Sequence, residues 1–195
     1  AVTFDWWHTL ADTPWEDYDS QMRRIRVARI GEAFAARGLV VEPVELYDAY
    51  DRHTALLLET WKDDIELDGD RQVRAFLELA GLNPFDLDLA DAVARSFGEA
   101  IRSKLPILYP HVDSVLSNLR EQGYRIGLVS NTGRTWGRFL RPIQDEFGIG
   151  KYFDERVFSD EVGVRKPNPR IFEAILDRLD LEPDEVVHIG DDLRA

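Results

Sequence analysis

Apolar and polar residues form two kinds of pattern along the chain. Short, continuous apolar runs that suit buried strands lie at residues 2–4, 124–130, 157–158 and 186–189. Longer segments repeat apolar residues every three or four positions, as one face of a helix does, over residues 15–37, 44–62, 71–80, 86–104, 111–122, 132–147 and 168–179. The intervening residues 11–14 and 105–110 contain proline, and we predict a loop and a connector there.

The order of these elements predicts the fold class. From residue 105 onwards strands and helices alternate, which is typical of a parallel sheet covered by helices. The strand at residues 2–4 belongs to the same sheet but is separated from it by a block that is almost entirely helical. We therefore expect an α/β core made of residues 1–14 and 105–195, and a second, α-helical domain over residues 15–104.

Composition narrows the class of protein further. The chain has 195 residues, no cysteine and a net charge of −13 at pH 7. Disulfides, thiolate metal sites and cysteine nucleophiles are thereby excluded. The acidic balance argues against nucleic acid as a partner, because such binding depends on Lys and Arg that neutralise phosphates. No apolar run approaches the ~18 residues of a membrane span and no leader is visible, so we expect a cytoplasmic protein without membrane contact.

Polar side chains follow the predicted strands. Asp5 ends the first strand, Ser130 and Asn131 end the second, Lys166 follows the third, and Asp191 follows the last. Because the carboxyl ends of parallel strands share one edge of the sheet, these groups should surround one crevice. Each residue alone is explained equally well by a turn, a helix cap or the solvated surface. Their conjunction favours a functional site.

This set of groups suits phosphoryl chemistry. A carboxylate such as Asp5 can act as a covalent nucleophile. A Mg²⁺ ion with oxygen ligands would fit between Asp5 and Asp191 and bridge to a substrate phosphate. The ion and Lys166 would offset the negative charge of the phosphoryl oxygens, and Ser130 would hold another oxygen.

The chain at this point resembles the haloacid dehalogenase (HAD) superfamily. The resemblance rests on Phe4-Asp5-Trp6-Trp7-His8-Thr9-Leu10, Gly127 to Asn131, Val164 to Phe172, and His188 to Asp192, and it spans the whole chain. It implies a Rossmann-like three-layer core with a parallel sheet, and an α-helical cap inserted after the first strand. It also implies that the C-terminal end of the core lies beyond Ala195.

The resemblance implies a role for each matching residue. Asp5 would be the nucleophile, Ser130 and Asn131 would bind phosphate, and Lys166 would stabilise charge and contact substrate. Asp5 and Asp191 would hold Mg²⁺ together with the backbone carbonyl of Trp7. The expected activity is hydrolysis of a small phosphorylated metabolite through an aspartyl-phosphate at Asp5.

The first motif departs from the family pattern in one respect. Family phosphatases usually read Asp-x-Asp-Gly-Thr, in which the second Asp exchanges protons with the leaving group and with water. Here Trp7 occupies that position and His8 replaces the Gly. An indole cannot exchange protons near neutral pH, whereas an imidazole can, so His8 could substitute as a catalytic acid and base. Alternatively, His8 packs locally without a catalytic role.

Three functions remain open at this stage. A phosphatase is favoured; a catalytically impaired binding protein with the same fold and a 2-haloacid dehalogenase-type hydrolase are the alternatives. Family dehalogenases often carry an aromatic residue where Trp7 stands, but the Gly190-Asp191-Asp192 motif favours metal binding. The arginines at positions 23, 24, 26 and 29 form either a solvated, acid-paired face or a wall that faces an anion. Possible cap contacts to substrate are Trp15, Arg23, Arg26 and His53, and the oligomeric state is not readable.

Overall fold

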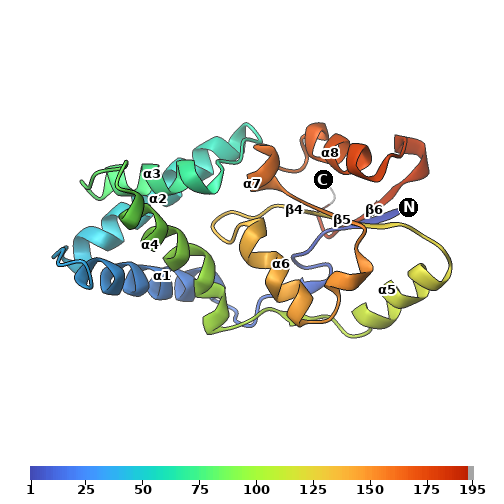
Figure 1. Cartoon of the computed structure of the whole chain (residues 1–195), viewed down its shortest axis with the longest axis horizontal. Helices are drawn as coiled ribbons and strands as arrows, with labels where there is room; N and C mark the ends of the chain where they lie inside the picture. The colour runs from blue at the N-terminus through green and yellow to red at the C-terminus, as the bar shows by residue number, and fades with distance from the viewer. Residues whose placement is uncertain (193–195) are drawn as a thin grey trace.

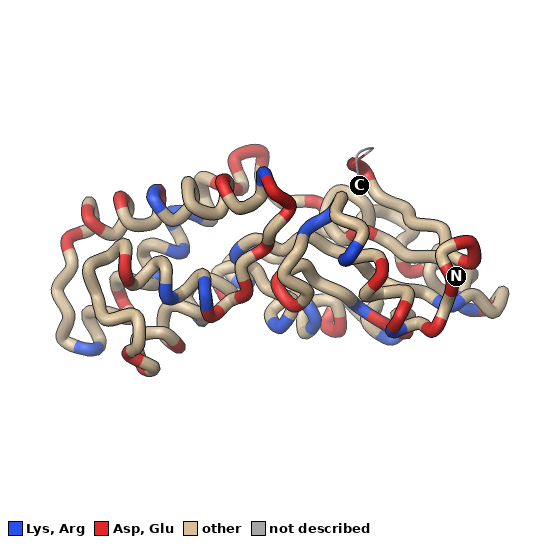
Figure 2. The backbone as a smooth tube through the Cα atoms, turned by 90° about the horizontal axis from the view of Figure 1, so that it is seen from above, with Lys and Arg blue, Asp and Glu red and all other residues tan. Residues whose placement is uncertain are grey.

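The chain folds into two parts that lie side by side, an α/β part and a helical part (Figure 1). The structure is a computed structural model and describes residues 1–192. The helical part is made of residues 18–103 and is entered and left through short segments next to the sheet. Asp and Glu occur along both parts (Figure 2), in keeping with the strongly negative net charge.

A parallel sheet organises the α/β part. Its strands are β1 (Val2–Phe4), β4 (Ile126–Ser130), β5 (Glu155–Phe158) and β6 (Val187–Ile189), in the order β5-β4-β1-β6. All three strand pairs are parallel, and Phe4 is in register with Leu128 on one side and Ile189 on the other. The carboxyl ends of these strands therefore point to one edge, as the sequence predicted.

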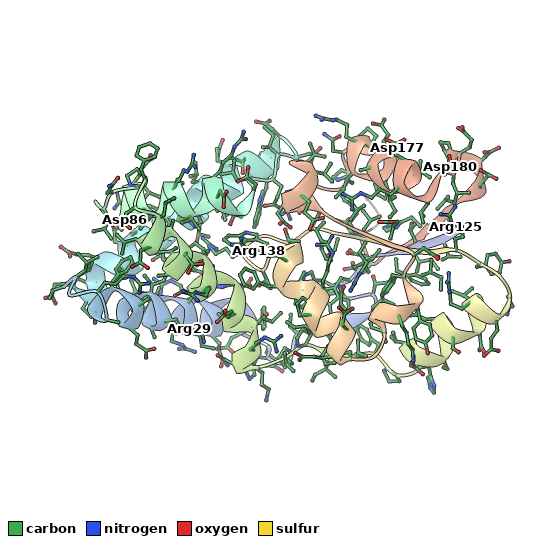
Figure 3. The ribbon with its side chains drawn as sticks, in the orientation of Figure 1. Arg29, Asp86, Arg125, Arg138, Asp177 and Asp180 are labelled. Carbon is green, nitrogen blue, oxygen red and sulfur yellow. The ribbon has the colours of Figure 1, made fainter. Side chains whose placement is uncertain are left out.

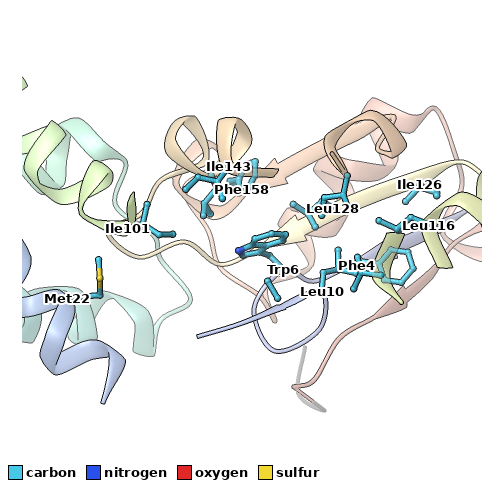
Figure 4. Close-up of a cluster of buried hydrophobic side chains, with 14 of the residues drawn as sticks. Phe4, Trp6, Leu10, Met22, Ile101, Leu116, Ile126, Leu128, Ile143 and Phe158 are labelled. Atoms are coloured by element: carbon cyan, nitrogen blue, oxygen red, sulfur yellow. The ribbon is translucent and has the colours of Figure 1, made fainter. Parts of the chain in front are cut away.

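Helices cover both faces of this sheet. On one face, α8 (Pro169–Leu179) packs Ile171, Ile175 and Leu179 against Val129 of β4. On the other face, α5 (Val112–Glu121) and α6 (Gly137–Glu146) contribute to a cluster that contains Leu128 (Figure 4). The neighbouring residues Leu128 and Val129 of β4 thus point to opposite faces of the sheet, as successive side chains of a strand do. The predicted three-layer α/β fold is confirmed.

The helical part has an apolar cluster of its own. It contains α1 (Tyr18–Ala35), α2 (Pro43–Lys62), α3 (Gly69–Leu79), α4 (Leu87–Gly98) and a 3₁₀ helix (Glu99–Ser103). Ile30, Phe76 and Phe97 are fully buried there. Trp136, which belongs to the loop before α6, packs into the same cluster and so ties the two parts together.

Several predicted elements need correction. Residues 11–14 and 105–110 are not simply loops, because β2 (Ala11–Asp12) and β3 (Ile107–Leu108) pair as a two-stranded antiparallel sheet. Two residues are too few to show a period, so the sequence carries no signal for this pairing. The predicted helices over 15–37 and 132–147 begin only at Tyr18 and Gly137, and the one over 86–104 gives way to a 3₁₀ turn after Gly98.

The remaining elements are short. They are the helix α7 (Ser159–Val162) and 3₁₀ turns at Gly150–Tyr152 and Pro183–Glu185. Within residues 1–192, no helix combines the length and apolar character that crossing a membrane requires.

Candidate active site

A cavity of about 710 Å³ lies where the carboxyl edge of the sheet meets the helical part. Six of the seven predicted site residues line it, namely Asp5, Trp7, His8, Asn131, Lys166 and Asp191. The helical part supplies Asp19, Arg26 and Trp61 to the same walls. The strand ends and the motif after the first strand thus pointed to residues that share one cavity.

Asp5 and Lys166 form a buried ion pair at the sheet edge. Lys166 Nζ lies 2.6 Å from Asp5 Oδ2, and the two side chains are 3% and 11% exposed. Asp5 Oδ1 also accepts a 2.7 Å hydrogen bond from the backbone N–H of Trp6. Burial raises the pKa of Asp5 above its usual value, and the Lys166 ammonium and the Trp6 N–H oppose that rise.

The loop after β4 holds the backbone of Lys166 in place. The side-chain amide of Asn131 donates to the Lys166 carbonyl (3.2 Å) and accepts from the Lys166 N–H (2.9 Å). This reciprocal pair gives Asn131 a positioning role in addition to its place on the cavity wall. Ser130 is fully buried and is absent from the described residues that line the cavity, so its predicted contact with substrate stays a prediction.

The predicted metal ligands offer a suitable donor set for Mg²⁺. Asp5 and Asp191 are close enough that the charge of Asp191 raises the pKa of Asp5. Two neighbouring carboxylates on a cavity wall that Trp7 also lines provide hard oxygen donors of the kind that Mg²⁺ prefers. Across residues 1–192, no three His, Asp or Glu side chains converge as a complete metal site, so backbone or substrate oxygens would complete the coordination.

Trp7 and His8 differ in their surroundings. Trp7 is partly buried against the aromatic rings of Trp6 and Tyr18. His8 is half-exposed, has a positive φ of 57°, and places Nδ1 3.1 Å from Asp12 Oδ1. The Thr13 N–H, the Tyr109 hydroxyl and His8 hold the pKa of Asp12 below its usual value. His8 lines the cavity, and the Asp12 carboxylate lies beside its ring. A histidine with a neighbouring carboxylate is an arrangement that can serve proton transfer.

Of the four residues suggested as cap contacts, the cavity wall includes Arg26 but not Trp15, Arg23 or His53. Arg23 instead forms an exposed bidentate pair with Asp51 on α2, with distances of 2.6 and 2.5 Å. His53 is fully buried and stacks on Phe97. The acid-paired alternative therefore holds for Arg23, Arg24 and Arg29. Arg26 lines the cavity, and its role towards an anion stays a prediction.

Glu66 is a buried residue that the sequence did not single out. It lies in the acidic turn after α2, yet its side chain is fully buried against the α/β part. Its carboxylate pairs with Arg165 and accepts hydrogen bonds from Ser159 Oγ (2.8 Å) and Trp61 Nε1 (3.1 Å). Ser159 Oγ in turn accepts from the N–H of Thr132 at 2.9 Å. Glu66 thus connects the helical part to the loops that carry Asn131 and Lys166.

Comparison with known proteins points to one family. The family model described as a haloacid dehalogenase-like hydrolase matches residues 1–194. Glyceraldehyde 3-phosphate phosphatase of Methanothermobacter thermautotrophicus is 43% identical over 84 residues, which are 42% of this chain and 35% of that protein. Phosphoglycolate phosphatase of Salmonella paratyphi A is 30% identical over 131 residues, which are 62% of this chain and 50% of that protein. The matches thus span between a third and a half of these relatives.

Solved structures share the fold. The crystal structure of CbbY from Rhodobacter sphaeroides in complex with phosphate has a TM-score of 0.57 at 22% identity, covering 99% of this chain and 78% of that chain. That of a HAD phosphatase from Thermococcus onnurineus has a TM-score of 0.55 at 23% identity, covering 100% and 78%. At these identities the likeness concerns the fold.

Proposed function

The chain belongs to the haloacid dehalogenase-like hydrolase family, and we propose that it serves as a Mg²⁺-dependent phosphatase for a small phosphorylated compound. The observation that carries the proposal is the buried Asp5–Lys166 pair on the wall of a cavity that also contains Asp191. The names of the phosphatase relatives agree with this proposal. We propose that residues 15–104 form the cap and that residues 1–14 and 105–195 form the core, of which residues 193–195 lie outside the described part of the chain.

The first half of the reaction forms a covalent intermediate on Asp5. A carboxylate oxygen of Asp5 attacks phosphorus, the new O–P bond forms, and the ester P–O bond breaks. The leaving alkoxide takes a proton and departs as the alcohol. Lys166, held by Asn131, places its ammonium beside the reacting carboxylate and stabilises the charge of the phosphoryl oxygens.

Asp5, Asp191 and the carbonyl of Trp7 would hold the Mg²⁺ ion. When bound, the ion would supply positive charge that offsets the repulsion between these carboxylates and a phosphate. The acidic surface makes such local compensation necessary for any anionic substrate.

The second half releases phosphate. Water attacks phosphorus, the Asp5 O–P bond breaks, and the carboxylate is regenerated. We propose that His8, aligned by Asp12, gives the proton to the leaving oxygen and then accepts one from this water, because Trp7 cannot. One group suits both transfers, because the imidazole that has given up its proton to the leaving oxygen is then free to accept a proton from water.

A test uses the full-length protein and a panel of small phosphate esters, with phosphate release as the readout. We expect hydrolysis with Mg²⁺, none with excess chelator, and recovery when Mg²⁺ is restored. Hydrolysis that is indifferent to chelator, or no hydrolysis of any ester, would contradict the proposal.

A second candidate function rests on Trp7. Its partly buried indole lines the cavity where phosphatases of the family carry an acid, as the dehalogenase alternative expects. In that reaction a carboxylate oxygen of Asp5 forms a C–O bond and halide leaves. Halide release from a 2-halo acid in the presence of chelator would favour it over the phosphatase.

A further inference from the structure

The cavity contains more positive charge than the reaction at Asp5 uses. Four cationic side chains line it: Arg26, Arg134, Arg165 and Lys166. Lys166 pairs with Asp5, and Arg165 pairs with Glu66. Arg26 and Arg134 form no ion pair with any carboxylate among residues 1–192, although most arginines of the helical part do.

Arg26 is held by neutral acceptors. It projects from α1 and is only 8% exposed. Its Nε donates to the Phe97 carbonyl (3.1 Å), Nη1 to the Tyr50 hydroxyl (3.3 Å) and Nη2 to Thr135 Oγ1 (2.9 Å). A buried guanidinium without a counter-charge is costly to desolvate, and an anion at its open face would offset that cost.

Arg134 repeats this pattern from the α/β part. Its guanidinium donates to His53 Nδ1 (3.3 and 3.1 Å) and to Thr54 Oγ1 (2.8 Å), and lies 4.2 Å from the centre of the Tyr50 ring. Because Nδ1 of His53 accepts, that imidazole is neutral, and burial lowers its pKa to about 3. Burial and the charge of Arg26 likewise lower the pKa of Arg134 to about 10.

Nearby carboxylates do not neutralise this pair of arginines. Asp51 already has a bidentate partner in Arg23. Asp19, together with Glu16 and Asp17, also lines the cavity, but all three are solvent-exposed and their charge is largely screened. Asp19 and Asp51 oppose the fall in the pKa of Arg134 from a distance. A ligand that reaches Arg26 and Arg134 therefore meets two cations that form no ion pair with a carboxylate in the described part of the chain.

We propose that Arg26 and Arg134 form a second anion subsite, so that the substrate bears, besides the reacting phosphate, a second anionic group such as a carboxylate or another phosphate. This inference rests on the proposed function for the reacting group and adds the substrate class. Guanidinium groups suit either anion, since their donors match both planar carboxylate and phosphate oxygens. Arg26 comes from the helical part and Arg134 from the α/β part, so such a substrate would bind across the junction.

The test measures binding separately from turnover. Asp5→Asn protein is titrated calorimetrically with Mg²⁺ present, using 2-phosphoglycolate against ethyl phosphate and a sugar bisphosphate against its monophosphate. Each pair differs by one anionic group, and the two pairs distinguish a carboxylate from a phosphate. We expect at least one of the two compounds with a second anionic group to bind about tenfold or more tightly than its partner, because a charged hydrogen bond adds that much affinity.

Arg134→Gln should remove this preference, and Arg134→Lys should keep part of it. Arg29→Gln is the matched control and should keep the preference. Arg29 lies on α1 (Figure 3), the helix that also carries Arg26, but it pairs with Glu99 outside the cavity. The proposal is overturned if neither compound with a second anionic group is preferred over its partner, or if the preference survives in Arg134→Gln. If the compounds with a second anionic group bind preferentially but no phosphate is released by wild-type protein, the subsite stands and the phosphatase proposal fails.

Discussion

Lys166 Nζ lies 2.6 Å from Asp5 Oδ2, with both side chains almost completely enclosed. One comes from the end of β1 and the other from a loop more than 150 residues later, and the amide of Asn131 fixes the backbone of the second. A buried carboxylate stays ionised only if a nearby positive charge offsets the cost of its burial, and here Lys166 is that charge.

Replacing Lys166 should therefore disable the site. We expect Lys166→Met to lower kcat by about 10²- to 10³-fold, the range for removal of one preorganised charge from a transition state. It should also move the activity profile to higher pH, because Asp5 loses the group that lowers its pKa. Lys62→Met, which removes an exposed lysine, serves as the control. Unchanged kcat in Lys166→Met would show that the pair is only structural.

His8 gives a second prediction. If it replaces the missing acid, His8→Gln should lower kcat by about 10²-fold or more while KM changes little, and the pH profile should lose one limb. Asp12→Asn should give a smaller loss, because Asp12 only orients the ring across 3.1 Å. Steady-state kinetics between pH 5 and 9 test both. If His8→Gln retains full activity and the same pH profile, the imidazole has no catalytic role.

Glu66 allows a prediction about stability. Glu66→Ala leaves Arg165, Trp61 and Ser159 without a buried acceptor, so it should reduce the free energy of unfolding by about 3–5 kcal/mol. Glu59→Ala, which removes one half of an exposed pair, should cost less than about 1 kcal/mol. Urea unfolding of both variants measures the difference. Equal losses would mean that Glu66 does not join the two parts.

His53 makes acid stability testable. Its pKa falls from about 6.5 to about 3 on folding, so only the unfolded chain binds a proton between these values. The titration of His53 therefore costs nothing above pH 6.5. Below pH 6.5 and down to about pH 3 it lowers the free energy of unfolding by about 1.4 kcal/mol for each pH unit.

His53→Asn keeps an acceptor for Arg134 but does not titrate. Its unfolding free energy should therefore fall less steeply between pH 6 and 4 than that of the wild type. Burial raises the pKa of Asp160 to about 6, so the protonation of Asp160 stabilises the folded protein as pH falls, opposite to the effect of His53. Subtracting the unfolding free energy of one protein from that of the other removes this shared contribution. If the unfolding free energies of the two proteins fall with the same slope between pH 6 and 4, His53 is not buried and neutral.

The sequence revealed the reacting half of the cavity because of a simple regularity. In a parallel sheet, a polar residue that ends an apolar run lies at the carboxyl edge, which located Asp5 and Asp191 without coordinates. Lys166 follows the third strand only after a further loop, and its role came from the family resemblance. The other half follows no such rule. Arg134 contacts His53 across 81 positions of sequence, and Glu66 contacts Arg165 across 99. A basic or acidic side chain in a helix or turn is usually solvated, and only packing reveals the exceptions.

The two short strands illustrate the same limit. β2 and β3 pair only because the chain enters and leaves the helical part at adjacent points. That adjacency is a property of the assembled fold, whereas local composition at residues 11–14 and 105–110 indicates only an interruption of helix.

The central claim is that Asp5 carries the phosphoryl group. The most direct measurement is a single-turnover reaction with Mg²⁺, quenched in acid and reduced with borohydride, which converts an aspartyl phosphate to homoserine for detection by peptide mass spectrometry. We expect homoserine at position 5 in wild-type protein, and neither homoserine nor phosphate release in Asp5→Asn. Phosphate release with position 5 unmodified throughout the turnover, or undiminished release by Asp5→Asn, would contradict it.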